Sequence, residues 1–468
     1  MGGRLVMAVF SRIYFTQLER AKRIDGEYYQ PKYLTLAELH KRGQWLPIRK
    51  YLELCEYGIS IKMNEKGDAQ KIFRMDDLKD GFAFDHEMKF APIDRDTLER
   101  FRLLPNDILF NRVNSEEFVG RTGIFKLTGD YVFASYLIRL RTNNGMSPDA
   151  LNLFLNCKYG VLSIRRLSRR AVNQANVNAQ ELQSILMPRF SSDFQEILTR
   201  YSNDSWTLYT ESERLYKQAE QLLLAELGLQ DWKPTHALTF VGSYRGVMQA
   251  QRIDAEYFHP KFKEMLDKVP QQIKFDRLGR LTTYKKGVEV GSSAYTDSGI
   301  PFWRVSNLSS HGLDDSNANF INQELYENLR QDYEPQQGEI LLSKDATPGL
   351  AYYLEHPIQG IISSGILRLT ITDTIPPHYL ELVLNSFFVQ MQIEQDAGGS
   401  IIKHWKPSEV RKTLIPRLSD DKEKEIAGLV QQSHAARREA KALLEKAKRA
   451  VEIAIEEGED KAMEFISS

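Results

Sequence analysis

The side chains in this sequence best suited to chemistry are basic and amide groups, and they are clustered. From Lys158 to Arg170 there are five basic residues and no acidic one, and residues 171–178 are rich in asparagine and glutamine. Lysine and arginine bind phosphates, whereas Asn, Gln and Arg side chains read base edges. The pattern is typical of a nucleic-acid contact, although a solvated basic helix face has the same composition.

A second segment of this kind spans residues 398–406. It places two glycines and a serine beside Lys403, His404 and Trp405, and glycine allows a backbone to approach a ligand closely. Residues 452–464, in contrast, carry six acids and one lysine. The formal net charge of −1 therefore averages opposed regions and does not exclude a polyanionic partner.

Catalytic and cofactor motifs are absent from the sequence. There is no Gly-x-x-x-x-Gly-Lys-Ser/Thr loop, no Gly-x-Gly-x-x-Gly turn, no His-Glu-x-x-His and no Gly-x-Ser-x-Gly elbow. Residues 376–379, Pro-Pro-His-Tyr, resemble the Asn/Asp-Pro-Pro-Tyr motif of amino-methyltransferases. Ile375 stands at the Asn/Asp position, however, so the segment favours a helix start.

Metal and disulfide chemistry also lack a signal. The nine histidines are scattered, with no pair at metal-ligand spacing on one face. Cys55 and Cys157 are far apart, which argues against a disulfide framework and a cysteine-rich zinc site. We therefore expect a protein with no catalytic residues, no cofactor and no metal.

The segments that must position these residues are duplicated. Residues 23–33, Arg-Ile-Asp-Gly-Glu-Tyr-Tyr-Gln-Pro-Lys-Tyr, recur at 252–262 with seven of eleven positions identical. The offset of 229 residues, from Arg23 to Arg252, recurs within a few residues along each half. The chain is a tandem duplication of a unit of about 230 residues. Such a duplication predicts pseudo-twofold symmetry, with one site per half or one site shared between the halves.

Each unit is predicted to be α+β. Short apolar runs bounded by turn residues, such as 108–110 and 340–342, predict strands of a compact sheet. Amphipathic patterns predict one helix from Asp149 to about Leu167 and one from His378 to about Glu394.

A long helix is predicted to close each unit. Ser192 and Gln195 have capping-box spacing, and Gly228 supplies the stop about 36 residues later. Such a helix is roughly 54 Å long and suited to setting a distance. Heptad spacing predicts coiled-coil packing. The predicted stripe is Tyr201, Leu208, Leu215 and Leu222 in the first helix, and Ile426, Leu429, Ser433, Ala436, Ala440, Leu443, Ala447, Ala450 and Ala454 in the second.

The overall composition is that of a soluble globular protein. Of the 468 residues, 42% are hydrophobic and 27% are charged. No run of 18 apolar residues occurs, and the amino terminus lacks a signal-peptide core. We expect a cytoplasmic protein with no membrane partner.

Four motifs make the chain resemble the specificity (S) subunits of type I restriction–modification systems. They are the duplicated lead-in at 23–33 and 252–262, Gly-Ile-Pro-Phe-Trp-Arg-Val-Ser-Asn-Leu at 299–308, Gly-Glu-Ile-Leu-Leu-Ser-Lys at 338–344, and Gly-Ser-Ile-Ile-Lys-His-Trp-Lys-Pro-Ser at 399–408. Their order and duplication extend over nearly the whole chain.

The resemblance implies a non-catalytic, sequence-specific DNA-binding subunit. Two target recognition domains would each read one half of a bipartite double-stranded DNA target. The long helices would pack as an antiparallel coiled coil, set the spacing between half-sites, and dock two modification (methyltransferase) subunits and the restriction subunits. The implied segments are a lead-in (1–45), recognition domain 1 (46–190), a central helix (191–229), a second lead-in (230–272), recognition domain 2 (273–418), and a C-terminal helix with acidic tail (419–468).

The residue types and the resemblance together predict which side chains contact DNA. Lysines are expected on phosphates, and amides and arginines on bases. For Arg74 and Arg304, a structural ion pair at a strand end is the alternative. The lead-in residues Arg23, Asp25 and Glu27, with their repeats, are expected to serve the fold or a partner interface. The predicted DNA contacts are Arg74, Asn111, Arg112, Asn173, Gln174, Asn176, Arg304, Lys344, Lys403 and His404.

Two other functions are alternatives to this one. A coiled-coil scaffold whose globular domains bind protein or RNA would have the same helices. A self-sufficient methyltransferase–nuclease would need motifs that the sequence lacks. The first domain also departs from the family pattern, because residues 170–174 replace the flexible Gly-Ser type segment and Glu116-Glu117 lie beside Asn111-Arg112.

Overall fold

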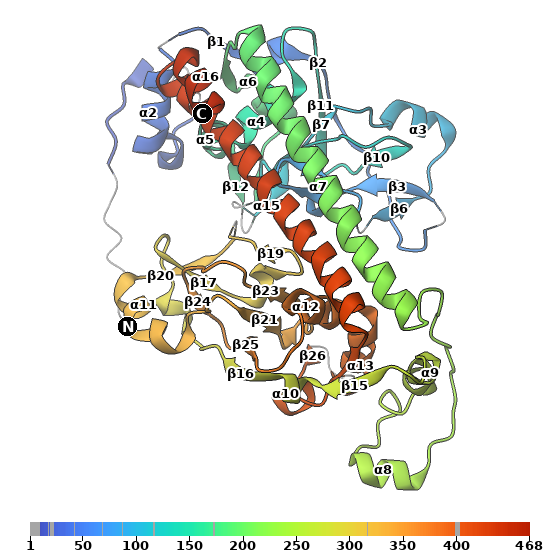
Figure 1. Ribbon diagram of the computed structural model, residues 1–468. Helices are drawn as coiled ribbons and strands as arrows, with labels where there is room; N and C mark the ends of the chain where they lie inside the picture. Colours follow the sequence, from blue (N-terminus) through green and yellow to red (C-terminus); the bar gives the residue numbers. More distant parts are fainter. Residues whose placement is uncertain are drawn as a thin grey trace. The chain divides into compact units, whose positions relative to one another are not determined.

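The computed structural model describes residues 10–16, 18, 23–41, 43–67, 69–86, 88–115, 118–171, 174–315, 317–397 and 403–468. The chain divides into two compact units (Figure 1). The first unit is Met1–Tyr209 together with Arg438–Ser468, and the second is Thr210–Arg437.

The first unit is built around a six-stranded sheet with the order β2-β11-β7-β9-β5-β4. A smaller, three-stranded sheet of the same unit has the strand order β10-β3-β6. All four residues of β7 are buried, which explains why its first three residues, 108–110, are all apolar. The strands are β2 (Leu52–Tyr57), β3 (Gln70–Phe73), β4 (Leu78–Lys79), β5 (Phe82–Ala83), β6 (Lys89–Ala91), β7 (Ile108–Asn111), β9 (Thr122–Ile124), β10 (Tyr131–Phe133) and β11 (Leu137–Thr142).

Smaller sheets and short helices also belong to the globular part of this unit, within the described residues. The sheets are β12-β13-β8 and the antiparallel pair β1–β14. Their strands are β1 (Trp45–Pro47), β8 (Val113–Asn114), β12 (Arg169–Ala171), β13 (Gln174–Asn176) and β14 (Leu186–Pro188). The helices are α2 (Pro31–Leu39), α3 (Arg95–Phe101), α4 (Pro148–Asn156), α5 (Lys158–Leu167) and α6 (Ala179–Ser184).

The second unit repeats this plan with a four-stranded sheet, β16-β25-β21-β23. Its other sheets are β20-β17-β24, β15-β27, β18-β19 and β22-β26. The strands are β15 (Lys274–Arg277), β16 (Thr282–Lys286), β17 (Ile300–Trp303), β18 (Leu308–Ser309), β19 (Gly312–Leu313), β20 (Asn319–Ile321), β21 (Glu339–Ser343), β22 (Asp345–Ala346), β23 (Ala351–Tyr353), β24 (Ile361–Ile362), β25 (Ile366–Ile371), β26 (Lys403–His404) and β27 (Leu414–Arg417). The helices are α8 (Tyr244–Ala250), α9 (Pro260–Lys268), α10 (Leu278–Leu281), α11 (Gln323–Tyr333), α12 (Pro377–Asn385), α13 (Phe387–Ala397) and α14 (Pro407–Val410).

Equivalent details recur at the offset found in the sequence. In each unit the small sheet has one parallel and one antiparallel pairing: β3 with β10 and β6, and β17 with β24 and β20. A glycine follows the first strand of each large sheet where two chain segments nearly touch. A Cβ at Gly58 would lie 2.3 Å from the Phe133 carbonyl oxygen, and one at Gly287 would lie 2.1 Å from that of Ser363. Any larger residue at either position would push these segments apart.

The helices predicted at 149–167 and 378–394 are each two helices, so the prediction of single helices was wrong. Cys157 separates α4 from α5, and Ser386 separates α12 from α13. Both residues have extended backbone angles, φ −78° and ψ 167° at Cys157 and φ −68° and ψ 156° at Ser386. Gly160 fits the first break because a Cβ there would lie 2.0 Å from the Phe154 carbonyl oxygen.

The long helices α7 (Ser192–Glu226) and α15 (Asp420–Glu456) contribute residues to both units. In the first unit, Ser205 Oγ donates a 2.8 Å hydrogen bond to the Ala440 carbonyl. In the second unit, Ser433 Oγ donates one of 2.8 Å to the Ser212 carbonyl. Since a serine of one helix reaches the backbone of the other, the helices approach closely at these points. A short helix, α16 (Glu459–Ser467), follows α15.

The buried face of α7 coincides only in part with the predicted stripe, of which Leu215 is buried. Tyr201, Leu208 and Leu222 are only half-buried, whereas two rows that also repeat every seven residues are buried. The predicted stripe followed large apolar side chains, but the buried rows also contain serine and alanine, and Ser205 and Ser212 lie where the two helices approach. The buried rows are Leu198, Ser205, Ser212 and Ala219, and Ser202, Tyr209, Tyr216 and Leu223. On α15, the predicted Ile426, Ser433, Ala440, Ala447 and Ala450 are buried.

The start of α7 also differs from the prediction. Ser191, not Ser192, caps the helix, since its Oγ accepts a 3.3 Å hydrogen bond from the Phe194 N–H. Gln195 turns its amide to the Phe190 carbonyl at 2.9 Å instead of closing a capping box. Its oxygen accepts a 2.7 Å bond from the Ser147 N–H, which joins the helix start to α4.

Candidate nucleic-acid interface

In the first unit, the sheet β12-β13-β8 gathers several of the predicted DNA contacts. Strand β13 pairs antiparallel with β12 on one side and with β8 on the other. Gln174 and Asn176 are exposed, and Ala175 between them is buried. Because strand side chains alternate between faces, the two amides lie on the same solvent-facing side.

Arg112 adjoins this sheet through the backbone. Its carbonyl accepts a 3.0 Å hydrogen bond from the Val177 N–H, just beyond β13. Its Nε donates a 3.0 Å bond to the Ser135 carbonyl, and its guanidinium carbon lies 5.0 Å from the ring centre of Tyr57. The side chain is therefore held in a defined, partly exposed position.

Arg74 reaches the same region from a different segment. Asn114 of β8 donates a 3.5 Å bond to the sulfur of Met75, which follows Arg74. The Arg74 guanidinium lies 3.4 Å from the Asp77 carboxylate, and the Arg74 N–H donates to Asp77 at 2.6 Å. The ion pair anticipated as an alternative for Arg74 is thus present in the structure. Burial raises the pKa of Asp77 to about 6, despite the opposing effect of Arg74.

Asn111 occupies a different environment from the other nominated residues. It is fully buried, and its amide donates a 3.1 Å bond to the Phe118 carbonyl. Its backbone also pairs with Gly120 and Arg121. In this conformation the side chain supports the loop after β7 and does not face solvent. Asn173 lies outside the described residues.

In the second unit, the pair β22–β26 brings Lys344, Lys403 and His404 together. Asp345 pairs with His404 and Ala346 with Lys403 along this pair. The Trp405 N–H donates a 2.8 Å bond to the Lys344 carbonyl. Lys403 is described here by its backbone alone.

Arg304 belongs to the same region. A Cβ at Gly365 would lie 2.8 Å from Val305 and 3.5 Å from the Asp345 carboxylate, so the turn after Arg304 packs close to β22. Arg304 Nη2 donates a 3.3 Å bond to the Asn317 carbonyl. The Arg304 N–H donates a 3.0 Å hydrogen bond to the side-chain oxygen of Asn307. At the equivalent turn of the first unit, the acceptor is the carboxylate of Asp77.

A carboxylate that the sequence did not flag organises this second cluster. Asp345 contacts Lys344 Nζ and lies 2.8 Å from His404 Nδ1. Burial opposes ionisation of Asp345, but the hydrogen bonds from Lys344 and His404 outweigh it and lower its pKa. The only signal in the sequence was an acidic residue directly after the lysine. His404 has 64% of its side chain exposed, whereas Lys344 has 16%.

The lead-in motif makes the same anchor in both units. Arg23 pairs with Asp25 at 2.7 Å and donates a 3.2 Å bond to the Leu167 carbonyl. Arg252 pairs with Asp254 at 2.6 Å and donates a 2.8 Å bond to the Asp396 carbonyl. Each anchor holds the end of the helix that precedes the nominated segment. In the first unit a cavity of about 270 Å³ lies here, lined by Arg23, Asp25, Glu27, Tyr33, Arg165, Arg166, Ser168 and Arg169.

The basic and acidic runs partly neutralise each other within the first unit. Glu452 accepts a 2.9 Å hydrogen bond from the Lys158 N–H at the start of α5, where a carboxylate is favourable. Glu456 accepts a 2.6 Å bond from the Tyr159 hydroxyl and lies 3.9 Å from Lys158 Nζ. The opposed charges seen in the sequence therefore meet where the start of α5 contacts Glu452 and Glu456. A separate ion pair joins Arg169 to Glu181 at 2.8 Å.

Two curated proteins that are similar to the chain are both type I restriction enzyme specificity subunits. No family model matches the chain. A putative type I restriction enzyme MjaX specificity subunit from Methanocaldococcus jannaschii is 21% identical over 400 residues, covering 84% of this chain and 87% of that protein. The type I restriction enzyme EcoKI specificity subunit from Escherichia coli is 25% identical over 179 residues, covering 37% and 38%.

These two relatives confirm the resemblance to type I specificity subunits. Two solved S subunit structures also match. The one from M. genitalium has 12% identity and a TM-score of 0.37, covering 92% of this chain and 97% of that one. The one from Thermoanaerobacter tengcongensis has 13% identity and a TM-score of 0.28, covering 89% of this chain and 97% of that one.

Among the helices of the described ranges, none is long and apolar enough to cross a membrane.

Proposed function

We propose that this chain is the non-catalytic specificity subunit of a type I restriction–modification complex. Residues 46–190 and 273–418 would each read one half of a bipartite double-stranded DNA target. The observation that carries the proposal is the paired arrangement of the two units. Each unit places predicted contacts on a small sheet: the amides of Gln174 and Asn176 on β13, which pairs with β8, and the basic residues Lys403 and His404 on β26, which pairs with β22.

The two surfaces differ in how they would bind. Gln174 and Asn176 present exposed amides, the groups that form paired hydrogen bonds with adenine. Lys344, Lys403 and His404 are suited to phosphates, and Arg304 to a base or a phosphate. Asn111 is assigned a supporting role because it is buried.

The long helices would set the spacing and dock the partners. Helix α7 has 35 residues and α15 has 37. At 1.5 Å per residue, each helix is roughly 50 Å long or slightly longer. One turn of duplex is about 34 Å, so such helices suit an antiparallel coiled coil that separates two half-sites. Two methyltransferase subunits, with restriction subunits in the full complex, would dock on them.

Methylome sequencing of cells with and without the chain tests the proposal. We expect one split adenine-methylation motif to disappear when the chain is deleted. An unchanged methylome overturns the proposal, and preferential binding of the purified chain to RNA would favour the scaffold alternative.

Exchange of residues 46–190 should change one half of the motif only. A four-residue insertion in α7, about one turn, should widen the gap between the halves.

A further inference from the structure

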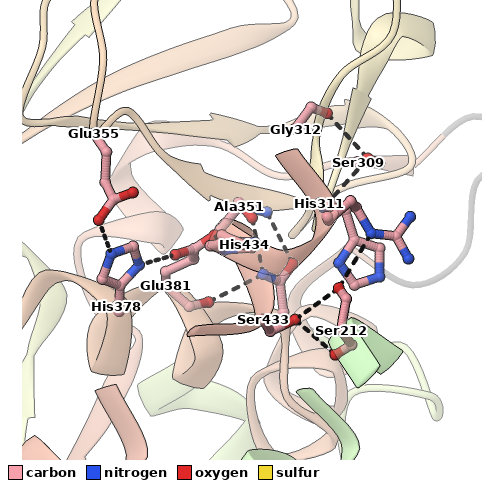
Figure 2. Close-up of polar contacts among 12 residues, drawn as sticks. Ser212, Ser309, His311, Gly312, Ala351, Glu355, His378, Glu381, Ser433 and His434 are labelled. Atoms are coloured by element: carbon pink, nitrogen blue, oxygen red, sulfur yellow. Dashed lines mark hydrogen bonds and ion pairs between the residues drawn. The ribbon is translucent and has the colours of Figure 1, made fainter. Parts of the chain in front are cut away.

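The second unit buries a carboxylate between two imidazoles (Figure 2). Glu381 and His378 are three residues apart on α12, and His434 lies on the part of α15 that belongs to this unit. Glu381 Oε2 is 2.9 Å from His378 Nδ1, and Glu381 Oε1 is 2.8 Å from His434 Nε2. The exposed side-chain fractions are 0% for Glu381, 7% for His378 and 2% for His434.

The negative charge of Glu381 requires a cation inside this cluster. Among the described residues, no lysine or arginine forms an ion pair with Glu381, and both of its oxygens face imidazole nitrogens. A buried carboxylate without a cation costs several kcal/mol in real proteins. Two cations fit the space: a proton shared with an imidazole, or a metal ion held by all three side chains.

The ligand atoms are placed for a metal ion. One ligand atom from each of His378, Glu381 and His434 lies within 4.8 Å of the other two. Two histidines and a glutamate are a known zinc ligand set, with zinc about 2.0–2.2 Å from each ligand atom. Ligand atoms around a tetrahedral ion are then roughly 3.3 Å apart. The two O···N contacts, at 2.9 and 2.8 Å, are a few tenths of an ångström shorter than this separation, so a small shift of the Glu381 carboxylate would suffice to admit an ion.

The surroundings of His378 distinguish a metal site from a chance contact. Its second ring nitrogen, Nε2, is 3.1 Å from Glu355 Oε1, and that oxygen also accepts a 2.8 Å bond from Gln431 Nε2. Metal-binding histidines almost always donate their other N–H to a carboxylate or carbonyl, which fixes the ring and raises its basicity. The rings of Tyr353 and Tyr352 lie 5.0 and 5.3 Å from those of His378 and His434 and wall off the cluster.

We propose that His378, Glu381 and His434 form a zinc site, with Glu355 orienting His378 and a water completing the four-coordinate shell. Zinc is favoured over magnesium or calcium because two of the three ligands are imidazoles. The ion would tie α12 to α15 within the second unit. The proposal is independent of DNA recognition.

The test measures zinc in the tag-free, full-length chain by mass spectrometry after dialysis. We expect about one zinc per wild-type chain, and a thermal transition that falls when a chelator is added. Cobalt substitution should give the visible absorption bands of a four-coordinate site. Glu381→Gln and His434→Gln should lose both the zinc and the bands, and Glu355→Gln should retain the ligands but bind zinc about 10–100-fold more weakly.

His236→Gln is the matched control, because this histidine is exposed and lies outside the cluster. It should bind zinc as the wild type does. The proposal is overturned if wild-type chain, folded by circular dichroism, holds no zinc and gives no cobalt bands, since the cluster is then bridged by a proton. Equal zinc in wild type and Glu381→Gln also overturns it, because the metal then lies elsewhere.

Discussion

The guanidinium of Arg252 donates a 2.8 Å hydrogen bond to the carbonyl of Asp396, 144 residues further along the chain. Arg23 makes the same bond to Leu167 at 3.2 Å, with the same separation of 144 residues. Each bond fixes the end of a helix, α13 or α5, directly before the segment that carries nominated DNA contacts. The duplicated lead-in motif is therefore an anchor for these segments.

Replacing Arg252 should release the second lead-in without unfolding its unit. Arg252→Gln loses the ion pair with Asp254 and the bond to Asp396, and hydrogen bonds from charged groups contribute about 1.5–3 kcal/mol each. We expect faster protease cleavage within residues 230–260 and little change in the main thermal transition. Arg245→Gln, at an exposed position of α8, is the control and should be cleaved at the wild-type rate. Unchanged cleavage in Arg252→Gln would show that other contacts hold the lead-in.

The buried pair of Glu339 and Arg368 should be essential for the stability of the second unit. Arg368 is 3% exposed, and its Nε and Nη2 donate to the Glu339 carboxylate at 2.7 and 3.0 Å. Glu339→Gln leaves a buried guanidinium without its counter-charge, which typically costs about 3–5 kcal/mol. Urea denaturation measures the free energy of unfolding.

Glu327→Gln is the control for this change. Glu327 pairs with Arg330 on the surface, with about half of each side chain exposed. Surface pairs contribute less than about 1 kcal/mol. If the two variants lose similar stability, the buried pair is not a stabilising element of the second unit.

Asp77 should make the first unit less stable as pH rises. Burial raises its pKa from 3.8 to about 6, so the folded state binds a proton more tightly than the unfolded state. The resulting stability is present at low pH and is lost as pH rises through about 6. Asp77→Asn keeps the acceptor for the Arg74 N–H, as Asn307 does for Arg304.

We therefore expect Asp77→Asn to raise the thermal transition at about pH 8 and to have less effect at about pH 5. Thermal unfolding at both pH values measures the difference. Asp76→Asn, at the exposed neighbouring position, should show no such dependence. A gain for Asp77→Asn that is equal at both pH values would contradict the role of its ionisation.

Much of the arrangement could be predicted because the chain repeats itself. The two long helices and the short strands of each unit could be predicted from the periodicity of apolar residues. The seam of α7 could not be predicted from large apolar residues, since Ser205 and Ser212 are buried there by contact with another helix. Burial of Asn111 likewise depends on the fold of its loop.

The cluster of His378, Glu381 and His434 was missed for a related reason. His378 and Glu381 are one helical turn apart, a spacing that puts them on one face. No second histidine stands at ligand spacing near them in the sequence, because His434 comes from α15, 56 residues away. Only tertiary packing brings it to the carboxylate.

Lys344 should bind a phosphate if the chain recognises DNA as proposed. Its ammonium faces Asp345 and lies beside His404, so it is held at the surface that β22 and β26 form. Lys344→Ala should weaken binding to every duplex by a similar factor. It should also reduce the slope of log affinity against log salt by about one, since one fewer counterion is released.

Binding of the methyltransferase-associated chain to target and scrambled duplexes, at several salt concentrations, measures both effects. Lys263→Ala is the control, because Lys263 is exposed on α9 and pairs only with Asp267 among the described residues. It should leave affinity and slope unchanged. If Lys344→Ala instead alters the preferred sequence while the slope stays constant, Lys344 reads a base, and the division between phosphate and base contacts in the second unit must be redrawn.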